Sequence, residues 1–370
     1  MRILELKILL LTKNLQVKKH SIDKVREMIE QAKGIGPANQ DSNVLIIDGL
    51  NTFIRVFSAV PALNDDGQHV GGVIGFLKSV GSNIRQFQAT RCIIVFDGTG
   101  GSSRRRKLYP DYKGNRKNKN KLNRYKEFED LVDEQASMKR QFTRLIEYFD
   151  VLPLTIITID NIEADDVIAY ITKQYYKDVD NKVTIVSTDR DFLQLINDDV
   201  RVYSPTKKKL YTKEKIEEEV GLLTENYLLY RMMSGDASDN IPGISGVGLK
   251  TLIKRFPEVV DTPMTADDII DKAAGLVADG SKLKIFKEIA SNKELLERNF
   301  KLMQLADVDI PGHSKLAIQD LMDSGVESIN RKIFRRLFLD DKLYANIKNV
   351  DNWLRDTFNR LNIFAKRNKQ

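Results

Sequence analysis

The chain has 370 residues, of which 42% are hydrophobic, and lysine plus arginine (59) exceed aspartate plus glutamate (52), giving a formal charge of +7. This length and composition suit one large α/β domain with appended helices, or two smaller domains, and they exclude a chain that is disordered throughout. Because Cys92 is the only cysteine, the sequence excludes an intrachain disulfide and a thiolate-rich zinc site, and it favours a reducing, cytoplasmic location.

Residues 1–41 are predicted to form an N-terminal extension. Apolar residues at helical spacing predict a helix over 21–33, with Ser21 as its N-cap and Gly34 as its stop. The opening residues are apolar, but Glu5 and Lys7 interrupt them and no small-residue cleavage site follows, so we expect no signal peptide. No apolar run approaches the roughly 18 residues that a membrane-spanning helix needs.

Short runs rich in β-branched residues follow in the body of the chain. They predict strands buried on both faces of a parallel sheet, at 44–47, 92–96, 154–159 and 183–186. Helical stretches, for example 73–87 and 128–149, lie between them. The alternation predicts a doubly wound α/β fold with a mostly parallel sheet over residues 42–225. In such sheets, sites form where the strands end.

Acidic side chains cluster at these predicted strand ends and in one later loop. The nine carboxylates are Asp48, Asp97, Glu163, Asp165, Asp166, Asp189, Asp191, Asp236 and Asp239. Each alone is an ordinary feature, since Asp-Gly is commonly a turn and acids suit the first turn of a helix. Gathered at one sheet edge, however, they would repel one another strongly unless cations neutralised them. Oxygen ligands without histidine or cysteine indicate Mg²⁺ or Mn²⁺, and two such ions ~4 Å apart can support phosphodiester hydrolysis.

A basic stretch begins just after Asp97. Residues 104–126 hold eleven lysines and arginines against one acid, Asp111, and Tyr109, Tyr112 and Tyr125 lie among them. On composition alone this is a solvated basic loop. Its place beside the acids and its aromatic rings favour a segment that contacts a nucleic-acid strand and stacks on unpaired bases.

Residues 243–250 read GISGVGLK. No buried strand precedes them, which argues against a dinucleotide-binding loop. Predicted helices at 226–233 and 249–256 flank them, so the segment fits a helix-hairpin-helix whose backbone N–H groups face a DNA phosphate; an ordinary glycine turn between two helices is the alternative. Helical segments at 267–277, 283–289 and 293–304 then predict that residues 261–370 form a helical cap on the sheet domain.

At these residues the sequence resembles the 5′-nuclease (flap endonuclease) family, which includes phage 5′-exonucleases and the 5′-nuclease domains of bacterial DNA polymerase I. The matching segments span residues 44–256 in the family's order and read VLIIDGLN, CIIVFDG, YPDYKGNR, NIEADD, VSTDRDFLQLI, SGDASDNIPG and GISGVGLKT. The part after residue 290 is more loosely similar to the T-even phage RNase H. The resemblance implies a PIN-like 5′-nuclease fold with a helical arch over 103–142, a hairpin region over 226–260 and a helical region over 261–370.

The resemblance also implies roles for single residues. Five acids would form one metal group (Asp48, Asp97, Glu163, Asp165, Asp166) and four a second (Asp189, Asp191, Asp236, Asp239). Lys113 matches the family lysine at the scissile phosphate, and Arg231 falls where relatives place a basic residue near it. The DNA-contacting residues would be Arg104, Arg105, Arg106, Tyr112, Arg116, Gly243, Gly246, Gly248 and Lys250. The family often binds K⁺ at this hairpin.

The function implied is a Mg²⁺-dependent 5′→3′ exonuclease and flap endonuclease that acts as a monomer on flap, nicked or RNA-primed DNA during replication, in the cytoplasm of the host if the protein is phage-encoded. The resemblance leaves RNase H activity open as a further activity. Replication proteins such as a single-strand-binding protein are the expected partners, and the basic tail 355–370 is either a contact for them or for DNA, or a solvated helix end. Two alternatives stay open: a PIN-type ribonuclease, which normally has fewer acids and lacks the hairpin, and a non-catalytic branched-DNA-binding protein, against which the complete set of acids argues.

Overall fold

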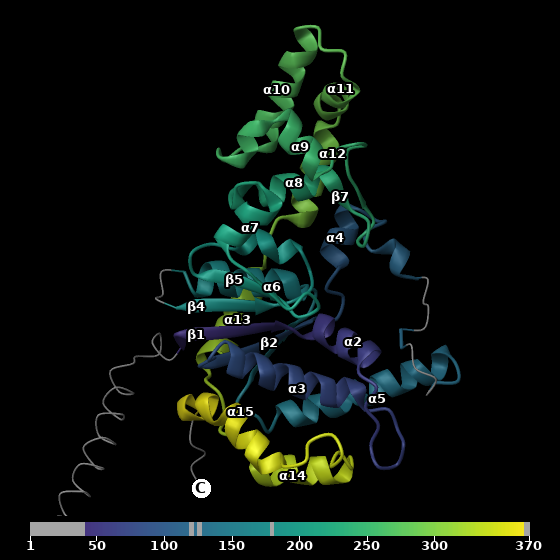
Figure 1. The fold of residues 1–370 in the computed structure, drawn as a ribbon, viewed down its shortest axis with the longest axis vertical. Coiled ribbons are helices and arrows are strands. Elements are labelled where there is room, and N and C mark those ends of the chain that lie inside the picture. The colour runs from purple at the N-terminus through teal and green to yellow at the C-terminus, as the bar shows by residue number, and fades with distance from the viewer. Residues whose placement is uncertain (1–40, 118–121, 124–127, 178–180, 366–370) are drawn as a thin grey trace, which may run out of the picture.

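The computed structural model describes residues 41–117, 122–123, 128–177 and 181–365. The helix expected at 21–33, the rest of the extension through residue 40, and parts of the expected arch lie outside these ranges. The described chain is elongated, with the sheet at its middle and helices extending to both ends (Figure 1).

A six-stranded sheet forms the centre, in the order β3-β2-β1-β4-β5-β6. Its strands are β1 (Asn43–Asp48), β2 (Arg91–Asp97), β3 (Thr155–Ile159), β4 (Lys182–Val186), β5 (Val200–Ser204) and β6 (Lys209–Tyr211). The first five are parallel to their neighbours, and β6 runs antiparallel to β5. The predicted doubly wound, mostly parallel sheet is confirmed, while β5 and β6 were not among the predicted strands.

Helices cover both faces of this sheet, which explains the continuously apolar strands. Leu45 and Ile47 face one apolar layer, and Val44 and Ile46 face the other. The first layer includes α2 (Gly49–Ala59), α3 (Gly71–Gln86), α5 (Leu131–Phe149), α14 (Arg331–Asp340) and α15 (Val350–Phe364). The second includes α6 (Ala164–Tyr170), α7 (Lys213–Val220) and α13 (Gly312–Asp323). A short helix, α4 (Ser103–Leu108), follows the loop after β2.

A separate apolar cluster holds the predicted hairpin region. It includes residues of α8 (Tyr227–Ser234), α9 (Leu249–Arg255), α10 (Ala266–Ala278), α11 (Lys284–Ser291) and α12 (Lys293–Met303). The short strands β7 (Gly235–Asp236) and β8 (Ile241–Pro242) lie between α8 and α9, and all of these elements together are called the hairpin unit. The helices of 261–370, expected to form one cap on the sheet domain, pack in two places. Helices α10 to α12 bury Ile269, Phe286 and Leu296 with the hairpin unit, whereas α14 and α15 bury Phe334 and Phe358 at the opposite end (Figure 1).

No helix within the described ranges is both long and apolar enough to cross a membrane.

Candidate active site at the strand ends

The parallel sheet brings the acids of separate chain segments to one edge. Asp48 ends β1, Asp97 ends β2, and Asp189 follows β4, while Asp165 lies in the first turn of α6, which follows β3. Asp97 Oδ1 accepts a hydrogen bond from the backbone N–H of Ala164 at 2.8 Å, which ties the end of β2 to the start of α6. The sheet thus gathers the four segments as the strand pattern predicted.

The last two acids reach the same edge from the hairpin unit. Asp236 lies in β7, and Asp239 lies in the turn that connects β7 to β8. The Tyr112 hydroxyl links the two predicted groups, since it lies 3.2 Å from Asp239 Oδ2 and 3.4 Å from Glu163 Oε2. Glu163 and Asp239 are therefore separated by one tyrosine hydroxyl.

Three of the acids are crowded together and carry raised pKa values. Burial, with smaller contributions from the charges of Asp189 and Asp97, raises the pKa of Asp48 to about 7. Burial also raises the pKa of Asp165 well above its ordinary value, and the charges of Asp189 and Asp48 add to this. For Asp189 the pKa is raised by burial first and by the charge of Asp239 among others. Each carboxylate thus disfavours ionisation of its neighbours.

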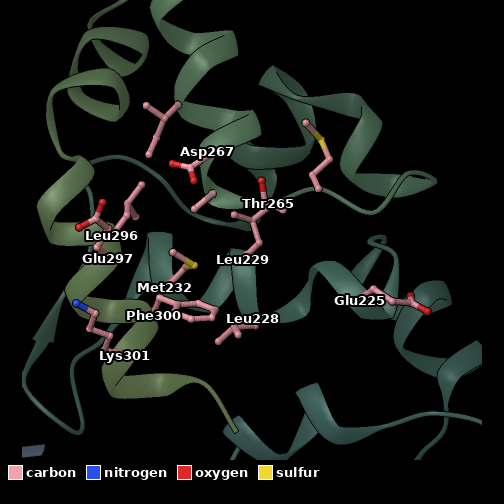
Figure 2. A pocket seen from close by; sticks show the side chains of 13 residues that line it. Glu225, Leu228, Leu229, Met232, Thr265, Asp267, Leu296, Glu297, Phe300 and Lys301 are labelled. Carbon is pink, nitrogen blue, oxygen red and sulfur yellow. The ribbon is translucent and has the colours of Figure 1, made fainter. Parts of the chain in front are cut away.

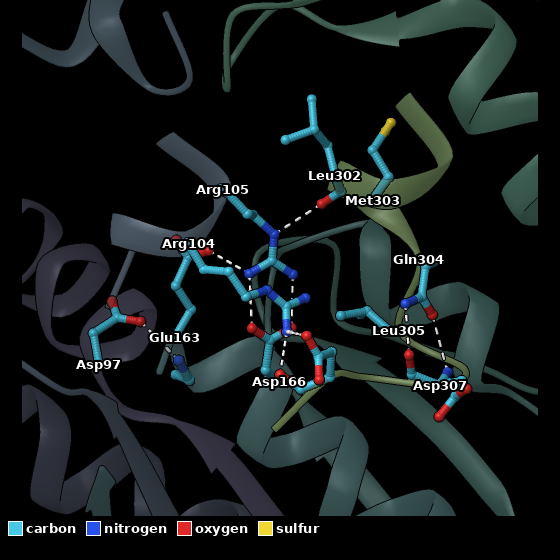
Figure 3. A network of polar contacts seen from close by, with 12 residues as sticks. Asp97, Arg104, Arg105, Glu163, Asp166, Leu302, Met303, Gln304, Leu305 and Asp307 are labelled. Atoms are coloured by element: carbon cyan, nitrogen blue, oxygen red, sulfur yellow. Dashed lines mark hydrogen bonds and ion pairs between the residues drawn. The ribbon is translucent and has the colours of Figure 1, made fainter. Parts of the chain in front are cut away.

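The other acids are neutralised by side-chain cations. Arg105 is buried and binds Asp166 through two nitrogens, at 2.7 and 2.9 Å, and it also forms an ion pair with Glu163 (Figure 3). Lys113 Nζ lies 2.5 Å from Glu163 Oε1. Although burial of Glu163 opposes it, the charges of Arg105 and Lys113 lower the pKa of this carboxyl. Glu163 is therefore held as a carboxylate.

Arg231 has the same role for the second group. Its Nε lies 2.9 Å from Asp191 Oδ1, and its Nη2 forms an ion pair with Asp236. Despite this cation, burial and the charge of Asp189 raise the pKa of Asp191 to about 7. The pKa of Asp236 is lowered against its burial by hydrogen bonds from Ser238 and by Arg231.

The donor set fits a hard divalent cation in its chemistry. Among the described residues, Asp48, Asp165 and Asp189 form no ion pair with a side-chain cation, and neighbouring like charges crowd their oxygens. A cation placed among them would relieve that repulsion, and oxygen is the ligand that Mg²⁺ prefers. In the part of the chain that the structure describes, no three acids are already close enough together to hold an ion. The acids would have to approach one another when an ion binds.

Lys113 is held over this cluster in a strained backbone conformation. Its φ of 57° lies in the left-handed region, which is uncommon for a residue other than glycine. Its backbone N–H donates to the carbonyl of Asp239 at 2.9 Å, and its ammonium lies 4.9 Å from the centre of the Tyr112 ring. Strain of this kind persists where the surrounding contacts enforce it, so the position of Lys113 is specified by both acid groups.

Of the residues of 104–116 that were expected to contact DNA, only some are exposed at the surface. Arg105 and Tyr112 are buried, with 5% and 3% of their surfaces exposed, and their polar atoms face the acids. Their side chains therefore do not lie at the surface, where DNA would contact them. Arg231 likewise faces carboxylates. Arg104 is partly exposed and donates to the backbone of Asp309, and Arg106 is exposed. The side chain of Arg116 lies outside the described residues.

The predicted hairpin connects α8 to α9 through β7 and β8. A Cβ on Gly243 would collide with the backbone of Ser234 at 2.2 Å, and Gly246 has a φ of +79°, so the fold requires glycine at both positions. Gly248 has ordinary φ and open space around it, so packing gives no reason for glycine there. Lys250 is exposed in the first turn of α9.

Three supporting residues were missed in the sequence. The Ser187 hydroxyl donates to Asp48 Oδ2 at 2.9 Å and accepts from the backbone N–H of Asp189 at 3.0 Å, so it joins two acids. The side chains of Asn51 and Thr188 bond to each other at 2.8 Å and connect the first turn of α2 to the loop after β4. Their position directly beside strand-end aspartates was the available signal.

The chain is similar to known nucleases over most of its length. A family model described as "5′-3′ exonuclease, N-terminal resolvase-like domain" matches residues 43–221. A 5′-3′ exonuclease of Bacillus subtilis is 31% identical, with 68% of this chain and 83% of that protein covered. A 5′-3′ exonuclease of Buchnera aphidicola is 28% identical, with 75% and 91% covered.

The fold is similar to that of a solved phage enzyme. The structure of a bacteriophage T5 5′-exonuclease with bound divalent zinc has a TM-score of 0.57 at 24% identity, with 81% of this chain and 98% of that chain covered. A T5 flap endonuclease in complex with DNA and metal ions has a TM-score of 0.57 at 22% identity, with 83% and 100% covered. By its sequence relatives and by its fold, the chain belongs to the 5′-3′ exonuclease family of nucleases.

Proposed function

We propose that this nuclease is a structure-specific 5′→3′ exonuclease and flap endonuclease that hydrolyses phosphodiesters near the 5′ ends of flap, nicked or RNA-primed DNA. The observation that carries the proposal is the meeting of three acids, the buried Asp48 and the half-buried Asp165 and Asp189, with Lys113 at the strand ends. A protein that only binds DNA has no need for acids gathered at its binding site, because they repel a phosphate once they are ionised.

The cofactor proposed is Mg²⁺, with Mn²⁺ as a substitute. Asp48, Asp165 and Asp189 would hold it first, and Asp97, Asp191 and Asp239 are proposed as further ligands. Glu163, Asp166 and Asp236 are already paired with cations. Bound at this edge, the ions would supply charge neutralisation for the phosphate and an activated water. The divalent ions in the T5 relatives support this choice. K⁺ at the hairpin is part of the same proposal.

Lys113 is the residue proposed to contact the scissile phosphate. Its ammonium lies beside Glu163, and its pKa is raised, because the charges of Glu163 and Asp165 outweigh its burial. It therefore stays protonated at neutral pH and can donate to a phosphate oxygen as negative charge develops there. For Arg231 the proposal is narrower: it would orient Asp191 and Asp236, because its guanidinium already faces them.

The hairpin is proposed to hold the duplex part of the substrate. Its open glycine, Gly248, lets a phosphate approach the backbone, and Lys250 adds a positive charge beside it. Gly243 and Gly246 shape the turn. We further propose that the protein is a monomer located in the cytoplasm. Its proposed partners are replication proteins such as a single-strand-binding protein.

Cleavage of a 5′-labelled flap DNA in Mg²⁺ tests this function, with product mapping on flap, nicked and RNA–DNA hybrid substrates. The Asp97→Ala variant should lose roughly 100-fold or more of the single-turnover rate, while it still binds the substrate without metal. Asp279→Ala, which removes an exposed acid at the end of α10, serves as the matched control. If Asp97→Ala cuts as fast as the parent, the proposed metal site is wrong.

A further inference from the structure

Helix α12 contacts the hairpin through one fully buried amide. Asn299 has 0% of its surface exposed. Its Nδ2 donates to the carbonyl of Met232 at 2.9 Å and to the carbonyl of Pro242 at 2.8 Å. Met232 lies near the end of α8 and Pro242 ends β8, so Asn299 binds both segments that hold the glycine turn.

The orientation of this amide is determined by a neighbouring arginine. Arg298 Nη2 donates to Asn299 Oδ1 at 3.3 Å. Only the amide nitrogen can donate to two carbonyls, and only its oxygen can accept from a guanidinium, so the contacts allow one orientation. Arg298 also lies over the ring of Tyr109, 4.5 Å from its centre, and Tyr109 caps the end of α4. The amide therefore connects the hairpin to α4.

The far end of α12 contacts the residues that hold the acids. The carbonyl of Leu302 accepts from Arg105 Nε at 2.8 Å, and Arg105 binds Asp166 and Glu163 (Figure 3). Gln194 donates to the carbonyl of Met303, the last residue of α12, at 2.9 Å, and accepts from the backbone N–H of Leu305 at 2.8 Å. Gln194 belongs to the same 3₁₀ turn as Asp191, so α12 meets both acid groups.

The apolar packing of α12 against α8 and α10 is incomplete on one side. A groove of about 490 Å³ lies between α8, α10 and α12, with Met232, Leu296 and Phe300 on its walls. Figure 2 shows these side chains around an open space. On this side the helices do not close on each other, so the two hydrogen bonds of Asn299 carry more of the connection than they would in a filled interface.

We propose that α12 sets the distance between the duplex-binding hairpin and the acids, and that Asn299 thereby determines which phosphodiester is cut. The inference rests on the proposed function, and Asn299 is a positioning residue, since it faces Met232 and Pro242 and not the acids. Successive nucleotides of one strand are about 3.4 Å apart along a duplex. A hairpin free to move by that amount would place a neighbouring phosphate over the acids.

The distribution of cleavage positions on a 5′-labelled flap substrate tests this role under single-turnover conditions in Mg²⁺. Asn299→Asp replaces the donating nitrogen with an oxygen that repels both carbonyls but still accepts from Arg298. We expect the preference for the main position over its neighbours to fall roughly fivefold, as for the loss of an ordinary hydrogen bond. Arg298→Met, which removes the link to Tyr109, should broaden the products in the same direction and decides the question if Asn299→Asp does not fold.

Asn226→Asp is the matched control. Asn226 is also buried, and its Nδ2 donates to two carbonyls of the same unit, those of Val259 at 2.9 Å and Thr262 at 2.7 Å. These bonds join the start of α8 to the segment after α9 and do not involve α12. We expect it to lose stability but to keep the parental positions. If both test variants cut more slowly at unchanged positions, or if Asn226→Asp broadens the products equally, the role of Asn299 is refuted while the proposed function stands. A parent protein that leaves the flap uncut refutes both.

Discussion

The two oxygens of Asp48 serve different purposes. Oδ1 caps α2 by accepting from the backbone N–H of Asn51 at 3.2 Å, and Oδ2 accepts from Ser187 at 2.9 Å. The ordinary explanation of an aspartate before a helix, a capping role, is thus correct for one oxygen. The other faces the acid cluster, and the buried group keeps a pKa of about 7 even with both bonds.

This raised pKa makes the stability of the metal-free protein depend on pH. A carboxyl whose pKa is higher in the folded than in the unfolded state stabilises the fold at low pH, and that stability is lost as pH rises from about 4 to about 7. The slope is about 1.4 kcal/mol per pH unit for one group. The lowered pKa values of Glu163 and Asp236 act only below their ordinary range, so they do not cancel the effect.

Urea unfolding in a chelator should therefore show that Asp48→Asn gains stability relative to the parent between pH 5 and pH 8. The comparison removes the contribution of groups that both proteins share. Mg²⁺ should stabilise the parent more at pH 8 than at pH 5, because protons compete with it for the same oxygens. A difference between parent and variant that is the same at both pH values would contradict the raised pKa.

Lys113 is expected to act on the rate of cleavage more than on binding. Lys113→Ala should lower the single-turnover rate by about 100-fold, because it removes a donor aimed at developing charge, and should weaken substrate binding by far less. Lys107→Ala, which removes an exposed lysine of α4, should leave the rate near that of the parent. Equal rates for the two variants would remove Lys113 from the catalytic residues.

At the scale of the elements, α4 is held to the sheet edge by Arg105 rather than by apolar packing. Arg105→Met would leave Glu163 beside Lys113 only, and Asp166 without its cation, in a buried place. Removing one partner of a buried ion pair typically costs about 3–5 kcal/mol, so urea unfolding in a chelator should show a loss of this order. The exposed neighbour provides the control, since Arg106→Met should change stability by less than about 0.5 kcal/mol. If the two losses are alike, Arg105 does not neutralise the acids.

The strands and Arg105 together show what could and could not be predicted from the sequence. Strands β1 to β4 were predictable because burial on both faces produces uninterrupted apolar runs, and their ends located Asp48, Asp97 and Asp189. In β5, Arg201 and Tyr203 alternate with buried Val200 and Val202, a pattern that the search for continuous runs passed over. The burial of Arg105 could not be predicted, because it depends on the carbonyl of Leu302, almost two hundred residues away.

At the scale of the whole molecule, the hairpin unit and the sheet form separate apolar clusters, and the acids lie where they meet. Binding of the duplex and cleavage of the strand should therefore be separable by mutation. The glycine turn and Lys250 belong to the hairpin unit alone, while the strand-end acids belong to the sheet. A change in the turn should alter affinity and leave the chemistry at the acids intact.

Lys250→Ala provides that separation. Loss of one phosphate contact should weaken binding to a nicked duplex in a chelator and should lower the slope of log affinity against log salt by about 1. With the enzyme in saturating excess, the single-turnover rate in Mg²⁺ should stay within about twofold of the parent, because chemistry follows binding and the acids are unchanged. Lys254→Ala, which removes an exposed lysine from the last turn of the same helix, should bind with an unaltered slope. Identical slopes for Lys250→Ala and the parent would mean that no phosphate lies at this turn, and the duplex would then have to be held elsewhere.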